Sequence, residues 1–291
     1  MAPQLMQESV GSRKRLTQKI AFILFRFFSL SIVAILFAIL FFIIKNGIGV
    51  INWDFLSKAP QEGMTSGGIF PAIVGTLCLV IGSCLFSFPI GIMSGIYMNE
   101  YAKNGKLISF IRIMTNNLSG VPSVVFGLFG MSLFVNFLGF GDSIIAGSLT
   151  LGLMSLPLVI RTTEEALKSI DNSFREGSLA LGATQLETIR KVILPMALPN
   201  IITGLILSIG RVSGETAPIL FTAVAYFLPQ LPTSIFDQVM ALPYHLYVIS
   251  TSGTDIEASR GMAYGTALVL ILILNLIANM IRKHFTDKNK I

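Results

Sequence analysis

Six long apolar stretches dominate this sequence and leave few folds open to it. A helix that spans a membrane needs about 20 apolar residues, because the hydrocarbon core of a bilayer is about 30 Å thick. The stretches cover residues 20–44, 69–98, 118–138, 143–160, 198–227 and 262–281. Because helices satisfy their own backbone hydrogen bonds in lipid, these stretches predict an all-α integral membrane protein with six transmembrane helices.

The low content of charged residues excludes most soluble functions. Only 12% of the 291 residues are charged, against about 25% in typical soluble domains, and the mean hydropathy is +0.76. The net charge is +6, but the basic residues lie at the ends of the apolar stretches rather than in one patch. Nucleic-acid binding, which needs a clustered basic surface on a soluble fold, is therefore excluded. A soluble enzyme and a disordered regulator are excluded with it.

The distribution of lysine and arginine predicts the orientation in the membrane. With the N-terminus inside, 16 of the 21 basic residues fall on the inner side, 3 on the outer side and 2 within the spans. Inner loops of membrane proteins carry this excess, so both termini are predicted to be cytoplasmic. The first stretch is too long for a cleaved signal peptide and is expected to remain as an anchor.

These boundaries divide the chain into four predicted segments. They are a cytoplasmic tail (1–19), a first transmembrane helix with its outer loop (20–68), a transmembrane core (69–282) and a second cytoplasmic tail (283–291). Within the core lie a cytoplasmic loop (161–197) and an outer loop (228–261). In the outer loop, residues 234–249 are predicted to form a short helix on the membrane surface; contact with an outer partner is the alternative.

The cytoplasmic loop is predicted to fold as a helical hairpin. Residues 163–168 and 173–181 have helical character, and Gly182 interrupts the pattern. Thr184, with a glutamate three residues later, forms a capping box that predicts the start of another helix. Pro195 is expected to end that helix. Such a hairpin, projecting from a membrane domain, suits docking into a groove on a soluble partner.

This loop resembles the EAA loop of permeases from ABC importers, which reads EAA, three residues, Gly, nine residues, I-x-L-P. The chain has Glu176-Gly177-Ser178, then Gly182, then Val192-Ile193-Leu194-Pro195, so the spacing matches throughout. Gly177 and Ser178 replace the two alanines of the motif, and Val192 replaces its isoleucine, so each residue is exchanged for one of similar kind. In that family the helix around the glycine couples to a separate ATPase. The resemblance implies a type-1 ABC importer permease with a MetI-like core, and an ATPase coupling loop that contains Glu176, Gly177, Ser178, Gly182, Leu194 and Pro195.

Arg211, within the fifth apolar stretch, is predicted to lie near the middle of a transmembrane helix. An arginine there costs several kcal/mol unless it is paired or faces water. Glu215, four residues later, is placed to form an ion pair on the same helix face. Two apolar residues would cost less, since desolvation offsets much of an ion pair's gain. The pair therefore indicates a substrate pathway, and the arginine's fork suits an oxyanion.

The segment 210–223, with the sequence GRVSGETAPILFTA, resembles the PstA family, the permease subunits of bacterial phosphate importers. Residues 67–76 and 156–165 agree with it, and the resemblance extends from about residue 20 to the end. It implies that Arg211 and Glu215 belong to the phosphate pathway. A second arginine of that family corresponds to Arg161, which a role as a positive-inside anchor explains equally well.

The resemblance also implies the partners. It predicts a PstC-type permease subunit, two PstB-type ATPase subunits and an extracytoplasmic phosphate-binding protein, in the cytoplasmic (inner) membrane of a bacterium. The chain has no GxxxxGK[ST] loop to hold nucleotide phosphates, so ATP and Mg²⁺ are expected on the ATPase subunit and no cofactor on this chain. The alternatives are a permease for molybdate, sulfate or phosphonate and, further removed, a membrane-embedded enzyme or a channel.

Two other features are expected to carry no chemistry. Cys78 and Cys84 lie in one apolar stretch without the spacing of a disulfide framework or a zinc site, and are expected to be buried thiols. Glu164 and Glu165 are adjacent, so on a helix they point about 100° apart. This separation does not suit joint acid–base catalysis, and the pair is predicted to be a solvated helix start.

Overall fold

A computed structural model describes residues 2–102, 105–252 and 256–288 and confirms the predicted membrane architecture. Five helical segments of this part are long and apolar enough to cross a bilayer, and a bent pair would make a sixth. They include all or part of the helices α1 (Ala2–Gly47), α3 (Phe70–Ile96), α6 (Ile144–Lys168), α9 (Leu194–Gly214) and α12 (Ile256–Lys288). A π-helical segment, η2 (Tyr97–Tyr101), extends α3.

The third predicted span is broken rather than continuous. The helix α4 (Lys106–Leu118) meets α5 (Ser123–Gly130) and its π-helical extension η3 (Met131–Phe137) at an angle of 101°. The bend falls between Gly120 and Pro122. Proline lacks a backbone N–H and disfavours helical geometry in the residue before it, so a helix cannot run smoothly through this point. Hydropathy alone does not register such a break.

The fifth predicted span was misplaced by about a dozen residues. The helix begins at α8 (Gln185–Thr188), continues through the π-helical segment η4 (Ile189–Ile193) and ends with α9 at Gly214. Pro195 does not end the helix, because it lies in the first turn of α9, directly after the π-helical segment. A π turn rearranges the local hydrogen bonds, and a proline N at the start of a helical segment needs no partner. A short helix, α10 (Ala217–Leu220), follows the break.

The centre of the bundle is a close seam between α3 and α6. A Cβ atom on Gly91 would lie 2.6 Å from Cγ1 of Val159, and one on Gly95 would lie 2.7 Å from Cβ of Thr163. Glycines at such positions let two helix backbones approach closely, which is how helices pack in lipid. Side chains of α5 and α9, such as Phe126 and Ile209, complete the core around this seam.

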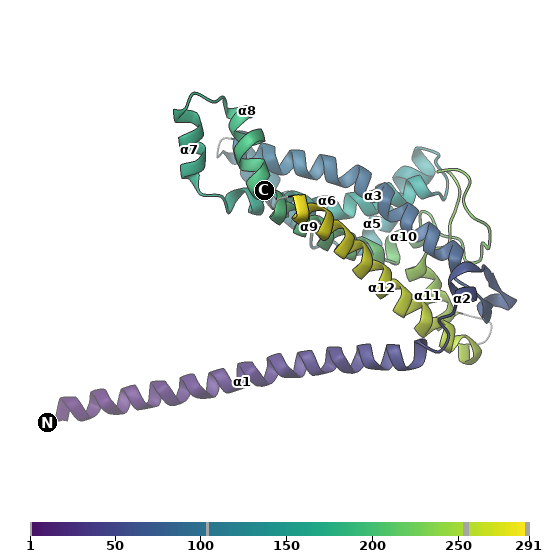
Figure 1. Cartoon of the computed structure of the whole chain (residues 1–291), viewed down its shortest axis with the longest axis horizontal. Helices are drawn as coiled ribbons and strands as arrows, with labels where there is room; N and C mark the ends of the chain where they lie inside the picture. The colour runs from purple at the N-terminus through teal and green to yellow at the C-terminus, as the bar shows by residue number, and fades with distance from the viewer. Residues whose placement is uncertain (1, 103–104, 253–255, 289–291) are drawn as a thin grey trace.

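One end of the bundle carries the hairpin, which we define as residues 172–188, made of α7 (Asn172–Ala180) and α8 (Figure 1). The predicted bend is confirmed, since Gly182 has a φ of +85°. The predicted capping box at Thr184 is also confirmed. Residues 163–168 do not form a helix of their own, because they are the last turns of α6. The helix and its buried side chains continue beyond residue 160, where the apolar stretch ends.

The opposite end carries the short elements α2 (Trp53–Ser57), β1 (Pro60–Gln61), η1 (Glu62–Met64), β2 (Ser66–Gly67) and α11 (Leu242–Thr251) (Figure 1). The two strands pair antiparallel. The predicted helix over 234–249 is corrected, since the helix begins only at Leu242. Val248 and Ile249 are buried in a cluster with Met262 of α12. This helix therefore packs on the protein.

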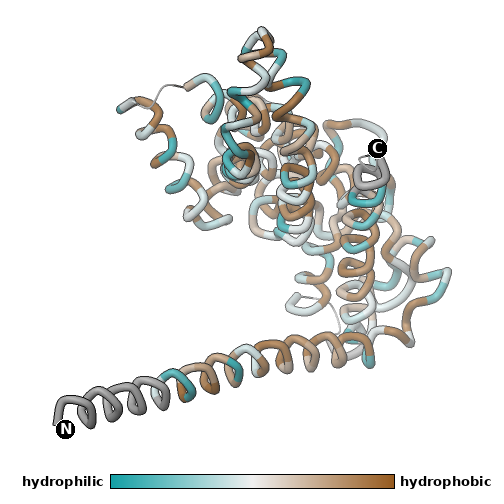
Figure 2. The backbone as a smooth tube through the Cα atoms, turned by 60° about the vertical axis from the view of Figure 1, so that its left-hand side comes forward, coloured by the Kyte–Doolittle hydropathy of each residue, from teal (hydrophilic) through white to brown (hydrophobic). Residues whose placement is uncertain are grey.

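The first helix projects away from the bundle (Figure 1). Only its end meets the rest of the chain, where Phe42 packs edge-on against Tyr264 of α12. The most apolar window of α1 is 0% buried, and most of the coloured part of this helix is brown, with a few teal bands between (Figure 2). Its apolar surface requires lipid or another membrane-embedded chain as its surroundings.

Candidate translocation and coupling sites

Arg211 lies in the last turn of α9, and Glu215 is the residue that caps this helix. The predicted ion pair is present, with 3.6 Å between Nε of Arg211 and Oε1 of Glu215. At this distance the two groups attract each other as charges but do not form a hydrogen bond. The side chains are 41% and 21% exposed, so the pair faces open space instead of the apolar core.

Arg211 is not in the middle of a continuous helix, as the sequence had suggested, but it lies near half the depth of the bundle. Gly204 of α9 packs directly against Thr162 of α6. Arg211 is seven residues further along, or about 10 Å of helix. Because α6 runs the opposite way, this places Arg211 roughly level with Ser155, close to the middle of α6. The ion pair therefore lies at the break between α9 and α10, about halfway along the bundle.

The structure does not bring Arg161 together with this pair. Arg161 lies on α6 six residues beyond Ser155, which is level with Arg211. Arg161 is therefore nearer to the hairpin end than Arg211 is, by about 10 Å of helix. Its Nε donates a hydrogen bond of 2.8 Å to Oε1 of Glu165, and both side chains are more than half exposed. An exposed pair of this kind contributes little to stability. Both explanations that the sequence left open for Arg161 remain compatible with this position.

Glu164 is a functional candidate that sequence reasoning missed. It was predicted to be solvated with Glu165, but its side chain is only 10% exposed. Its Oε1 forms ion pairs of 2.8 Å with Arg112 of α4 and 2.7 Å with Lys168. These three residues, with Arg161 and Glu165, line a cavity of about 200 Å³. Glu164 is buried because α4 folds back against α6, and no local pattern in the sequence indicates this contact.

The residues of the predicted coupling loop lie on and beside the hairpin. Glu176, Gly177, Gly182 and Pro195 are exposed, and Leu194 is half-buried. Ser178 is half-buried, and its Oγ lies 2.9 Å from Oγ1 of Thr188, a contact that joins α7 to α8. No Cβ atom added at Gly177 or Gly182 would meet another atom. The small residues of the motif therefore leave an open surface on the hairpin.

Apolar side chains on the hairpin point to solvent. Phe174, Leu179, Leu181 and Leu186 are 47%, 48%, 92% and 64% exposed. Asp171 caps α7 by accepting a hydrogen bond from the backbone N–H of Ser173. This bond holds the pKa of the Asp171 carboxyl below its usual range, which keeps the cap charged. A capped helical hairpin that presents apolar side chains to solvent has the character of a docking surface for a protein partner.

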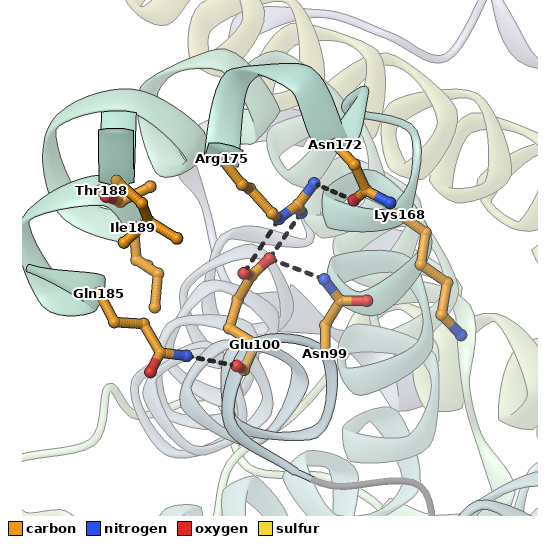
Figure 3. Close-up of a pocket in the computed structure, with 9 residues that line it drawn as sticks. Asn99, Glu100, Lys168, Asn172, Arg175, Gln185, Thr188 and Ile189 are labelled. Atoms are coloured by element: carbon orange, nitrogen blue, oxygen red, sulfur yellow. Dashed lines mark hydrogen bonds and ion pairs between the residues drawn. The ribbon is translucent and has the colours of Figure 1, made fainter. Parts of the chain in front are cut away.

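A buried ion pair connects the hairpin to the end of α3. Figure 3 shows the side chains of Arg175 in α7 and Glu100 in η2 facing each other. Nη2 and Nε of Arg175 donate hydrogen bonds of 2.7 and 3.1 Å to the two carboxylate oxygens of Glu100. The pair lines a polar cavity of about 510 Å³ between hairpin and bundle. The two residues are 75 positions apart, so no motif spacing predicts this contact.

The apolar helices of the bundle make the chain a multi-span α-helical membrane protein. Residues 87–290 match the family described as the binding-protein-dependent transport system inner membrane component. The chain belongs to this family, the permease subunits of ABC transporters. This confirms the predicted class of fold.

Relatives that span most of the chain support the same assignment. A probable ABC transporter permease protein of Bacillus subtilis, YqgI, is 35% identical, covering 91% of this chain and 95% of its own length. The phosphate transport system permease protein PstA of Mycobacterium leprae is 32% identical, covering 91% and 87%. That of Haemophilus influenzae is 31% identical, covering 84% and 86%. The resemblance to PstA proteins seen in the sequence is thus confirmed.

Solved structures show the same fold at low sequence identity. A chain of a bacterial ABC transporter for the polysaccharide alginate aligns with a TM-score of 0.61 at 14% identity, covering 94% of this chain and 95% of that one. A chain of the inward-facing MetNI methionine ABC transporter aligns with a TM-score of 0.59 at 18% identity, covering 74% and 94%. These similarities establish the type-1 permease fold.

Proposed function

We propose that this chain is a permease subunit of an ATP-driven importer of inorganic phosphate. The observation that carries the proposal is the Arg211–Glu215 pair, placed at a helix break near half the depth of the bundle. The similarity to PstA proteins of phosphate transport systems supports it. An arginine at this depth is costly unless it meets water or an anion, which is what a translocation pathway supplies.

The geometry suits transient binding of a tetrahedral oxyanion. A guanidinium donates two parallel hydrogen bonds to such an anion. Among the residues that the structure describes, no hydrogen bond engages the Arg211 guanidinium, and Glu215 stays 3.6 Å from it. Glu215 thereby neutralises part of the charge without occupying the fork. Phosphate would be attracted by Arg211 but held weakly enough to leave, and Arg161 would serve as a second cation further inward.

One such chain forms half of a pore, so a second permease of the PstC type completes the pathway. The exposed hairpin, including Glu176 and Gly182, would dock in a cleft of a PstB-type ATPase subunit, of which the complex holds two. ATP and Mg²⁺ would bind on those subunits, and a phosphate-binding protein would deliver the anion outside the membrane. The chain itself would lie in the inner membrane of a bacterium, with both termini and the hairpin in the cytoplasm.

In this mechanism the permease pair alternates between two access states. Closure of the ATPase dimer on ATP would displace the hairpins, and the bundles would rock open toward the binding protein. Released phosphate would pass Arg211 and continue to the hairpin end after ATP hydrolysis. The close α3–α6 seam makes these two helices a rigid unit, so a push at the hairpin end is carried along the bundle.

The second candidate is a permease for another oxyanion such as sulfate, molybdate or phosphonate. The geometry of the Arg211 site favours an oxyanion in general, since a guanidinium recognises any of these groups. The two candidates differ only in the cargo and share every partner class.

A test is to purify the complex through an affinity tag on this chain and measure ATP hydrolysis in nanodiscs. We expect an ATPase and a second permease to co-purify, and hydrolysis to rise on adding the binding protein with phosphate. If ATP hydrolysis rises with sulfate or molybdate but not with phosphate, the cargo is that other anion and not phosphate. Absence of any co-purifying ATPase would contradict the importer function.

A further inference from the structure

Of the ion pairs among the described residues, the one between Glu100 and Arg175 is the least exposed, and only the Arg112–Glu164 pair also joins two elements that are distant in the sequence. Most of the others join residues four apart on one helix, such as Lys191 and Glu187, whose side chains are 70% and 46% exposed. Glu100 and Arg175 are only 6% and 18% exposed and belong to different elements. Removing one partner of a buried pair leaves an uncompensated charge, which is strongly destabilising for that contact. The pair therefore holds its two elements in one arrangement.

Arg175 is also fixed from the other side. Its Nη2 donates a hydrogen bond of 3.0 Å to the backbone oxygen of Leu167, in the last turn of α6, and its Nη1 donates one of 3.0 Å to that of Ile170, just after this helix. The guanidinium thus bridges three elements, namely α6, α7 and the η2 end of α3. The five donors of an arginine in a planar fork make this possible, and a lysine would not reproduce it.

The second helix of the hairpin is tied to the same residue. Nε2 of Gln185, in the first turn of α8, donates a hydrogen bond of 2.7 Å to the backbone oxygen of Glu100 (Figure 3). Both helices of the hairpin therefore meet the bundle at Glu100. The hairpin is otherwise largely exposed, so these contacts are its main polar connection to α3.

The η2 segment also passes the connection on. Nη2 of Arg112 in α4 donates a hydrogen bond of 3.3 Å to the backbone oxygen of Met98. The η2 segment continues α3, and α3 packs along α6. A displacement of Glu100 would therefore reach α3, α6 and α4. Segments with π-helical hydrogen bonding often occur at functional positions, because one turn can rearrange without unfolding the helix.

We propose that Glu100 and Arg175 are positioning residues that transmit the displacement of the hairpin to α3 during transport. The inference rests on the proposed function, in that it needs an ATPase to move the hairpin. When the pair is intact, the hairpin and α3 move as one body. When it is broken, the hairpin follows the ATPase alone, and ATP is hydrolysed without movement of the substrate pathway.

The test measures the number of substrate ions transported per ATP hydrolysed by the full complex in proteoliposomes. Glu100→Gln preserves the shape of the side chain but removes its charge, and we expect this ratio to fall at least about tenfold with ATP hydrolysis retained. Arg175→Lys, which keeps the charge but loses the fork, is expected to lower the ratio as well. The charge-exchanged double variant Glu100→Arg with Arg175→Glu should restore part of it.

Lys191→Gln is the matched control, since it removes an exposed ion pair from the same hairpin region. It should leave the ratio unchanged. Equal losses of ATP hydrolysis and transport in Glu100→Gln, with no rescue in the double variant, would overturn the proposal in favour of a purely structural role. An unchanged ratio in a complex that assembles normally would overturn it as well.

A second measurement does not depend on the cargo. Spin labels are placed at Ser173 on the hairpin and Met93 on α3, both exposed, in a background with Cys78→Ser and Cys84→Ser. We expect a non-hydrolysable ATP analogue to leave the distance between the labels unchanged when the pair is intact and to change it in Glu100→Gln. This result would support the inference even in a complex that carries another anion. A distance that changes equally in both would contradict it.

Discussion

Arg211 is the residue on which the proposed transport chemistry depends. Its guanidinium lies at the end of a helix, where the negative end of the helix dipole favours a cation, and it is 41% exposed. A charge-assisted hydrogen bond contributes about 1.5–3 kcal/mol. If the transition state for translocation had one fewer such bond to the anion, transport would therefore slow by roughly 10- to 100-fold.

Replacing Arg211 with alanine tests this role. We expect phosphate uptake to fall by roughly 10- to 100-fold while the complex still assembles. Arg211→Lys keeps the charge without the fork and should retain intermediate activity. Arg26→Ala is the matched control, because Arg26 lies in an apolar helix, α1, but outside the bundle. Normal uptake by a correctly assembled Arg211→Ala complex would remove Arg211 from the pathway.

His245 predicts a pH dependence of stability. Its imidazole is 2% exposed and, among the described residues, has no hydrogen-bond partner. Burial lowers its pKa from 6.5 to about 4. Between these values the unfolded chain binds the proton and the folded chain does not, so the free energy of unfolding decreases as the pH falls from 6.5 toward 4. The shift corresponds to a loss of about 3 kcal/mol at the acid end.

Thermal unfolding of the purified chain in detergent, followed between pH 4 and 7, measures this effect. The variant His245→Gln should lose less stability than the wild type over this range, because glutamine does not titrate there. Parallel pH curves for the two proteins would show that the imidazole is not the group responsible.

The sequence predicted which residue types matter at this scale but not all of their partners. The Arg211–Glu215 pair was predictable, since its two members are one helical turn apart. Glu164 and Glu100 were not, because their partners Arg112 and Arg175 come from elements that are distant in the sequence. Charged residues near the end of an apolar stretch look solvated until a neighbouring helix covers them.

At the scale of elements, the hairpin depends on one backbone conformation. Gly182 has a φ of +85°, and a Cβ atom there would meet no other atom. Alanine at this position therefore adds strain without a clash. We expect Gly182→Ala to destabilise the hairpin by about 1 kcal/mol and to lower ATP-driven transport.

Gly177→Ala is the control for this prediction. Gly177 lies inside α7, and an added methyl group would again meet no other atom. Alanine is the better helix former by about 1 kcal/mol, so this variant should stabilise the hairpin slightly. Hydrogen exchange of residues 172–188 measures both effects. Equal hydrogen-exchange rates in Gly182→Ala and Gly177→Ala would contradict the prediction that alanine is strained at position 182.

The seam between α3 and α6 makes a second prediction. An added methyl group at Gly91 would lie 2.6 Å from Val159 Cγ1, so the helices would have to separate. We expect Gly91→Ala to cost about 1–3 kcal/mol through overpacking, seen as a lower unfolding temperature in detergent. Gly49→Ala, where a methyl group would meet nothing, should change little. Equal unfolding temperatures for the two variants would show that the seam tolerates the extra group.

Helix boundaries were predictable where a helix is continuous. The second, fourth and sixth stretches match α3, α6 and α12 within the apolar region. The third and fifth do not, because hydropathy averages over the breaks at Pro122 and Gly214. The prediction that Pro195 ends a helix was wrong, since a proline is compatible with the first turn of a helical segment as well as with a stop.

At the scale of the whole molecule, the two ends of the bundle differ in charge and structure. The hairpin end carries Arg112, Arg161, Lys168, Arg175, Arg190 and Lys191, and the opposite end carries the short elements around Trp53. The fold separates these ends along the length of the bundle (Figure 1). The positive-inside rule then predicts that the hairpin end is cytoplasmic.

Cysteine labelling tests this orientation. In a background with Cys78→Ser and Cys84→Ser, the exposed positions Trp53 and Leu181 are replaced singly with cysteine. We expect a membrane-impermeant thiol reagent to label position 53 in intact spheroplasts and position 181 only after permeabilisation. The reverse pattern would invert the topology and place the hairpin where no cytoplasmic ATPase can reach it.

The architecture of the whole chain was predictable because lipid permits few folds, and the family followed from the loop and the segment around Arg211. The projecting α1 was not predictable, since hydropathy shows that a helix spans a membrane but not what it packs against. Its exposed apolar surface needs lipid or another membrane-embedded chain around it.

The most direct measurement is uptake of radiolabelled phosphate at micromolar concentration, in cells with and without this chain. Sulfate and molybdate are added as competitors, and the Arg211→Ala variant is tested in the same cells. Uptake that depends on the chain and that neither competitor blocks is the result we predict. Uptake that is unchanged without the chain would leave the permease fold intact but contradict phosphate as its cargo.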